Sequence, residues 1–362
     1  MTLPLQVIAM MKRRNTIKVR IGNLFIGGDA PITIQSMTNT DTRDVQKTIN
    51  QIHKLTDAGC EIVRCAVADV ESAKALSQIK RSISIPLVAD IHFDYRLALK
   101  SIESGVDGLR INPGNIGSKD RVKEIVKKAK EHGIKIRIGV NSGSLEKWLL
   151  SRVNRGKLSL SEAMVESALE HIKILESLAF NQIVISLKSS DVLTTIDAYR
   201  LMAQKCNYPF HIGITEAGTI RSGTVKSSVG IGILINEGLC DTVRVSLASN
   251  PVNEVLVARD ILRSLGMREA VINIIACPTC GRAEFDVEKI ALAVEKKTLN
   301  IKKKLTIAIM GCIVNGPGEA READIGIAGS KKYVALFKNG DIIDKLPKSK
   351  IIQRLLKEIE NF

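Results

Sequence analysis

The chain has 362 residues, of which 45% are hydrophobic and 3% aromatic, and its formal net charge is +15. This hydrophobic content suffices for one large domain and a smaller one, and it excludes an intrinsically disordered chain. The positive charge is compatible with nucleic acid, an anionic surface or a phosphorylated substrate, and charge alone does not choose between them. Neither a membrane span nor a secretory signal is recognisable, and seven cysteines without a scaffold spacing favour reduced thiols, so we expect a cytoplasmic protein.

Short apolar runs alternate with amphipathic helical stretches over the first 250 residues or so, which is the pattern of a β/α protein. One such helix covers residues 41–58 and is ended by Gly59. The strands are expected at residues 31–37, 61–66, 86–91, 108–111, 134–140, 182–187, 210–215 and 242–247. Eight such units indicate an N-terminal (β/α)8 TIM-like barrel, closed by a final helix over residues 251–266.

The pattern changes after residue 266, so we divide the chain into a barrel (1–266) and a smaller C-terminal α+β domain (267–362). The second domain is expected to run through a strand, a cysteine loop, a helix at 287–295 and a strand at 305–310. A glycine-rich loop, two strands at 323–328 and 333–337, and a terminal helix from about Lys348 follow.

Three cysteines of the second domain form the clearest chemical motif. Cys277 and Cys280 share one tight turn, and Cys312 follows an apolar strand in a glycine-rich loop. Zinc, a dithiol and an iron-sulfur cluster are all compatible with this spacing. The domain contains no histidine as a fourth soft ligand, so a 4Fe-4S cluster with a carboxylate ligand, Glu319, is the favoured interpretation.

Polar side chains recur near the carboxyl ends of the predicted barrel strands, where barrel enzymes place their active sites. Because alternate residues of a strand share a face, the following residues are expected to line the mouth together: Arg64, Asp90, His92, Arg110, Asn112, Arg137, Asn141, Lys188, Glu216, Arg244 and Ser246. Four arginines and a lysine converging on one mouth would repel each other unless an anion were bound, and guanidinium groups match phosphate oxygens. A diphosphate substrate is therefore expected. The alternative is that the arginines pair with Glu61, Asp107 and Asp241 at the strand starts.

The motifs at residues 277–282 (Cys-Pro-Thr-Cys-Gly-Arg) and 311–319 (Gly-Cys-Ile-Val-Asn-Gly-Pro-Gly-Glu) resemble those of bacterial 4-hydroxy-3-methylbut-2-enyl diphosphate synthases. Barrel segments 109–116, 138–144, 186–190 and 213–218 resemble that family as well, and the likeness extends from Asn15 to the C-terminus.

The resemblance implies an iron-sulfur oxidoreductase of the methylerythritol phosphate pathway of isoprenoid biosynthesis. Its substrate would be 2-C-methyl-D-erythritol 2,4-cyclodiphosphate, which is opened and reductively dehydrated with two electrons from flavodoxin or ferredoxin. Cys277, Cys280, Cys312 and Glu319 would then hold the cluster, and Glu216 would be an acid near the reacting carbons. The arginines, Lys188 and Ser246 would hold the diphosphate, with Asn112, Asn141 and Asn315 adding hydrogen bonds.

The family also implies a homodimer in which the cluster domain of one subunit covers the barrel mouth of the other. Two alternatives stay open at this point: a zinc-containing RNA-binding protein, disfavoured by the few aromatic residues, and a barrel reductase acting on another phosphate ester. The sequence lacks a Walker A loop and a Cys-x-x-x-Cys-x-x-Cys run, so nucleotide hydrolysis and S-adenosylmethionine radical chemistry are not expected.

Overall fold

The computed structural model describes residues 13–268, 272–298, 301, 303–312, 314 and 316–362. The chain divides into two compact units, Met1–Met267 and Arg268–Phe362. Asn315, a predicted substrate-binding residue, lies outside the described residues. In the described part of the chain, no helix has both the length and the apolar character that crossing a membrane requires.

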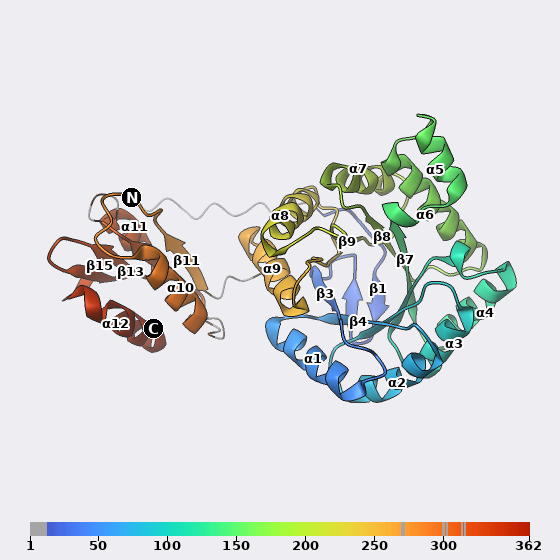
Figure 1. Ribbon diagram of the computed structural model, residues 1–362, viewed down its shortest axis with the longest axis horizontal. Helices are drawn as coiled ribbons and strands as arrows, with labels where there is room; N and C mark the ends of the chain where they lie inside the picture. Colours follow the sequence, from blue (N-terminus) through green and yellow to red (C-terminus); the bar gives the residue numbers. More distant parts are fainter. Residues whose placement is uncertain (1–12, 269–271, 299–300, 302, 313, 315) are drawn as a thin grey trace. The chain divides into compact units, whose positions relative to one another are not determined.

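The first unit is a parallel barrel surrounded by helices (Figure 1), which confirms the predicted fold class. Its strands are β3 (Thr33–Met37), β4 (Ile62–Ala66), β5 (Leu87–Asp90), β6 (Gly108–Ile111), β7 (Lys135–Asn141), β8 (Ile183–Lys188), β9 (His211–Ile212) and β10 (Thr242–Val243). The sheet order is β8-β7-β6-β5-β4-β3-β10-β9, and a parallel bridge between Ile185 and Phe210 joins its two ends. All eight strands lie within the predicted segments or differ from them by one residue.

Helices follow the strands and cover the outside of the barrel (Figure 1). They are α1 (Val45–Ala58), α2 (Val70–Arg81), α3 (Tyr95–Glu103), α4 (Lys119–Glu131), α5 (Lys147–Asn154), α6 (Leu160–Ser177), α7 (Val192–Ala203), α8 (Ile220–Asn236) and α9 (Pro251–Ser264). Two 3₁₀ turns, Pro113–Asn115 and Ser142–Ser144, follow β6 and β7. Gly59 ends α1 at φ 107°, as its position predicted, because a left-handed residue costs glycine little.

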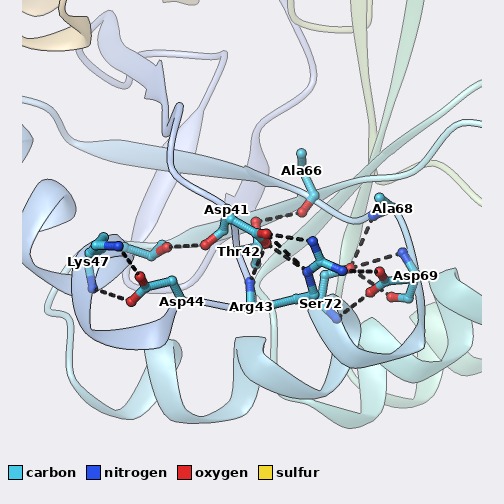
Figure 2. A network of polar contacts seen from close by, with 10 residues as sticks. Asp41, Thr42, Arg43, Asp44, Lys47, Ala66, Ala68, Asp69 and Ser72 are labelled. Atoms are coloured by element: carbon cyan, nitrogen blue, oxygen red, sulfur yellow. Dashed lines mark hydrogen bonds and ion pairs between the residues drawn. The ribbon is translucent and has the colours of Figure 1, made fainter.

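Capping interactions hold the loops after β3 and β4 together on the carboxyl side of the barrel (Figure 2). Asp44 caps α1 by accepting from Lys47 N (3.1 Å), and Asp69 forms a capping box with Ser72 on α2. Arg43 joins the loops because its guanidinium contacts both Asp41 (2.6 Å) and Asp69 (3.3 Å). Each exposed ion pair contributes little alone, but together with the caps they join the two loops.

A hairpin that the sequence did not predict closes the opposite end of the barrel. Strands β1 (Val19–Ile21) and β2 (Leu24–Ile26) pair antiparallel, and their buried side chains pack against residues at the starts of β4, β5 and β8. Just before it, Arg13 forms an ion pair with Asp241 (2.7 Å), and Arg14 donates to the Tyr208 carbonyl (2.5 Å). Both arginines are partly buried, so they attach this N-terminal segment to the barrel.

The second unit contains a five-stranded sheet in the order β11-β12-β13-β14-β15. Its strands are β11 (Ile272–Ala276), β12 (Leu305–Met310), β13 (Ile325–Gly329), β14 (Val334–Lys338) and β15 (Asp341–Leu346). Its helices are α10 (Val287–Thr298), α11 (Gly316–Glu322) and α12 (Ile351–Asn361), with a 3₁₀ turn at Lys348–Lys350. Two differences from the expectation are α11, which replaces part of a predicted loop, and the additional strand β15.

The barrel interior is unusually polar. Lys135 is 1% exposed and His211 is also 1% exposed, and neither ring nitrogen of His211 has a hydrogen-bond partner among the described residues. Burial, followed by the charge of Arg137, lowers the pKa of Lys135 from 10.5 to about 7. Burial, followed by the charges of Arg137 and Lys188, keeps the pKa of His211 well below its ordinary value, so this ring is neutral.

The depressed pKa of Lys135 predicts a specific pH dependence of stability. Between about pH 7 and 10.5 the unfolded chain binds more protons at this lysine than the folded chain does, so the unfolding free energy rises with pH across that window. Lys135→Met removes this dependence and should stabilise the barrel by a few kcal/mol near pH 7, at about 1.4 kcal/mol per pKa unit. Urea unfolding of both proteins from pH 6 to 10 measures the difference. If the two unfolding free energies differ by the same amount at every pH in this range, the pKa of Lys135 is not lowered.

Candidate active site

A cavity of about 100 Å³ opens at the carboxyl ends of the barrel strands. We call it the mouth. It is lined by Arg64, Asp90, His92, Arg110, Arg137, Gly139, Asn141, Ser186, Lys188, Thr215, Arg244 and Ser246. These residues come from β4 to β8 and from the segments that follow β5, β9 and β10, so the strand register brings distant parts of the chain together.

Nine of the eleven predicted substrate-binding residues lie in this lining. Asn112 does not: its side-chain oxygen accepts from Gly139 N (3.0 Å), so it supports the strand that carries Gly139. Asn315 lies outside the described residues. The predicted acid Glu216 is exposed and directly follows Thr215 of the lining, with its backbone in the left-handed region at φ 50°.

Asp90 connects three of the lining side chains. Its carboxylate lies 3.4 Å from Arg110, 3.7 Å from Arg64 and 3.7 Å from His92. Burial alone would raise the pKa of Asp90, but the charge of Arg64, the hydrogen bond from His92 and the charge of Arg110 together hold it well below the usual range. Asp90 is therefore ionised, and its position suits it to orient cations rather than to contact an anion.

Arg137 and Lys188 are also buried, but they lack a carboxylate partner among the described residues. Among the described residues, the ion pairs of the mouth join Arg64 and Arg110 to Asp90 and Arg244 to Glu254, and none involves Arg137 or Lys188. Burial, followed by the charges of the surrounding cations, lowers the pKa of both side chains well below their ordinary values. An anion in the mouth would relieve this repulsion.

The acids at the strand starts have other contacts. Asp107 pairs with Lys80 (2.5 Å), Asp241 pairs with Arg13 (2.7 Å), and Glu61 accepts from Ile34 N (2.8 Å). In the described part of the chain, Asp90 forms ion pairs with Arg64 and Arg110, and Glu254 forms one with Arg244. The lining of the mouth thus contains five cations and one carboxylate, Asp90, and Glu254 pairs with Arg244 from outside it, so the predicted excess of positive charge is present.

Two glycines make room for these cations. A Cβ at Gly139 would overlap the Arg110 guanidinium, which also donates to the Gly139 carbonyl (2.8 Å). A Cβ at Gly213 would overlap the Arg244 carbonyl and lie 2.8 Å from Lys188 Nζ. Glycine is therefore required at both positions for close approach of the long side chains.

Sequence reasoning missed several residues of the site. Gln35 accepts from Arg137 Nη1 (2.5 Å), and Ser186, Gly139 and Thr215 line the mouth. Strand parity could have found Ser186, which is two residues before Lys188, and Gln35, which is a polar residue inside a buried strand. Glu254 lies on a helix outside the barrel, so strand parity carries no signal for it.

The three predicted cysteine ligands lie in loops of the second unit. Cys277 follows β11, and Cys312 follows the neighbouring parallel strand β12. Gly311 N donates to Cys277 Sγ (3.1 Å), the kind of contact that stabilises a thiolate, whereas Cys280 is exposed. Glu319 is exposed in the first turn of α11. In the described ranges, no three His, Cys, Asp or Glu side chains are close enough together to hold a metal ion.

The geometry of Gly139 gives a test of the mouth as an anion site. Gly139→Ala should displace Arg110 and weaken the binding of inorganic pyrophosphate by about tenfold, the equivalent of one charge-assisted hydrogen bond. Gly143→Ala is the matched control, because a Cβ at Gly143 has no atom within 4 Å. Isothermal titration calorimetry measures both affinities. Equal affinities in the two variants would exclude Arg110 from anion binding.

Comparison with known proteins identifies relatives over the whole barrel and the second unit. Residues 16–259 match the GcpE TIM-barrel domain, and residues 273–361 match the GcpE protein C-terminal domain. A Clostridium acetobutylicum protein named 4-hydroxy-3-methylbut-2-en-1-yl diphosphate synthase (flavodoxin) is 57% identical, covering 97% of this chain and 100% of its own. A protein of the same name from Geobacter sulfurreducens is 55% identical, covering 96% and 98%.

Among solved structures, the dihydropteroate synthase of Yersinia pestis covers 69% of this chain and 98% of its own at 8% identity, with a TM-score of 0.49. A likeness at this level carries no argument about function. The matches to both domains and the relatives above 50% identity are decisive, and this chain belongs to the GcpE family.

Proposed function

We infer that this chain catalyses the reaction for which its relatives are named, the formation of 4-hydroxy-3-methylbut-2-enyl diphosphate in isoprenoid precursor biosynthesis. The substrate would be 2-C-methyl-D-erythritol 2,4-cyclodiphosphate, which is opened and dehydrated with two electrons. The observation that carries this proposal is the excess of cations over carboxylates in the barrel mouth. Opening the ring frees one more ionisable phosphate oxygen, so a cation-rich site favours the opened state.

The residues of the site divide into three proposed roles. Arg110, Arg137, Lys188, Arg244 and Ser246 would bind the diphosphate, with Arg64, His92 and Asn141 at its edge. Asp90 would orient Arg64 and Arg110, and Asn112 would support Gly139. Glu216 would donate a proton near the reacting carbons, since it is exposed and directly follows Thr215, which lines the cavity.

The second unit would hold the electron-transfer centre. Cys277, Cys280 and Cys312 with Glu319 form a donor set suited to a 4Fe-4S cluster, because a carboxylate leaves one iron open to exchange. The hydrogen bond from Gly311 N holds Cys277 Sγ beside the loop that carries Cys312. When bound, such a cluster supplies electrons one at a time and a Lewis-acidic iron. Asn315 is proposed to act beside the substrate.

The domain division, 1–266 for diphosphate binding and 267–362 for the cluster, remains part of the proposal. Flavodoxin is the proposed electron donor, as in the names of the relatives, with ferredoxin as a possible substitute. Acidic carriers of this kind would be attracted to a chain with net charge +15. We also propose a cytoplasmic homodimer in which one subunit's cluster domain covers the partner's barrel mouth, because reduction requires exclusion of water from the substrate.

Metal analysis of anaerobically purified protein tests the ligand set. Cys312→Ala should lose most of its iron and sulfide, because the two thiolates that remain are too few to hold the cluster. Glu319→Ala should keep much of the iron but lose most of the turnover. Cys206→Ala, which changes a thiol of the barrel unit, is the control and should keep the native iron content. A colourless protein containing zinc would reject the cluster.

Turnover tests the substrate. Reduced holoenzyme incubated with the cyclodiphosphate and reduced flavodoxin should release the linear diphosphate, which phosphorus NMR distinguishes from the ring. Protein with a full cluster and no linear product would reject this substrate and favour another phosphate ester.

A further inference from the structure

Glu254 is a buried carboxylate on the outer layer of the barrel. It lies in the first turn of α9, the helix that follows β10, and it is 5% exposed. A buried carboxylate is costly unless hydrogen bonds and a cation compensate its charge. Nothing in the apolar packing of a barrel helix calls for a glutamate at this position, so its contacts must account for it.

The carboxylate joins β3 to the segment that follows β10. Oε1 accepts from Leu247 N (3.0 Å), while Oε2 accepts from Ser36 Oγ (3.4 Å) and from Arg244 Nη2 (3.4 Å). Arg244 Nε has no hydrogen-bond partner within the described part of the chain, so Glu254 supplies the contact that orients this guanidinium.

We propose that Glu254 is a positioning residue that sets the geometry of the diphosphate site through Arg244 and Ser246. The two mouth residues stand at alternate positions of one segment, and Leu247, the next residue, is held by the other oxygen of the same carboxylate. One side chain outside the mouth thereby fixes a cation and a hydroxyl inside it. This inference rests on the proposed function of the mouth as a diphosphate site.

A charge-balancing role is the competing explanation, and it predicts the opposite sign. Glu254→Gln raises the net charge near the mouth by one. If Glu254 only tempers the positive charge, the glutamine variant binds an anion more tightly. If Glu254 positions Arg244, the variant binds more weakly despite its added positive charge. Glutamine has one accepting oxygen for the two positions that the carboxylate oxygens occupy, so either the Arg244 contact or the Leu247 contact that holds the same segment is lost.

Calorimetric titration of holoenzyme with inorganic pyrophosphate separates the two explanations. We expect Glu254→Gln to weaken binding by about tenfold, the equivalent of one hydrogen bond to a charged group. Asp260→Asn is the matched control: it makes the same charge change on the same helix, at a side chain that is 63% exposed and paired with Arg259 and Arg263. Its affinity should stay within about twofold of the native value. Tighter or unchanged binding by Glu254→Gln would overturn the proposal.

A double-mutant cycle tests whether Glu254 acts through Arg244. In an Arg244→Ala background, Glu254→Gln should have less than half of its effect on pyrophosphate affinity, whereas a merely structural role would give the full effect in both backgrounds. In turnover assays Glu254→Gln should raise KM more than it lowers kcat, with an unchanged cluster spectrum. The pyrophosphate results do not require turnover, so a failure of the proposed reaction is distinguishable from a failure of this inference.

Discussion

The site depends on one electrostatic constraint, the convergence of five cations on a barrel mouth whose lining contains one carboxylate, Asp90, while Glu254 contacts Arg244 from outside the mouth. Asp90 and Glu254 hold three of the arginines, and Arg137 and Lys188 remain without an acidic partner in the described structure. Burying like charges together is unfavourable, which is why burial and neighbouring cations lower the pKa of both side chains. A multiply charged anion would remove that repulsion, and this relief would make the free energy of anion binding more favourable.

The barrel provides this arrangement through regular pairing. In register, Asp90 lies beside Arg110 and Arg110 beside Arg137, so cations on successive strands meet at one level. Gly139 and Gly213 leave the space that the long side chains need. The N-terminal hairpin and the apolar packing at the other end hold the strands that carry these residues. Arg43 and the helix caps hold the loops that follow β3 and β4.

Most of the barrel and most of its mouth could be predicted because strand parity is a local rule. Strand parity places Arg110 and Arg137 inside the barrel from the sequence alone. The comparison with relatives confirms the family and the fold. The hairpin of β1 and β2 could not be predicted with the same rule, since three-residue strands give too short an alternation. Helix α11 was missed because Gly316 and Gly318 are typical of loops.

Glu254 shows where local rules end. Its position four residues before the buried Ala258 places a charge on the core-facing side of α9, which indicates a special contact but not its partner. Only the tertiary structure brings this carboxylate to Arg244 and Ser36. The same holds for Asn112, whose type and position suggest substrate contact but whose side chain supports Gly139.

A crystal structure of the anaerobic holoenzyme with bound cyclodiphosphate tests the position of the diphosphate most directly. Both phosphate groups should lie within hydrogen-bonding distance of Arg110, Arg137, Lys188 and Arg244, with Asp90 and Glu254 still paired to their arginines. Phosphate groups bound away from the mouth, with these four cations in contact only with solvent, would contradict it.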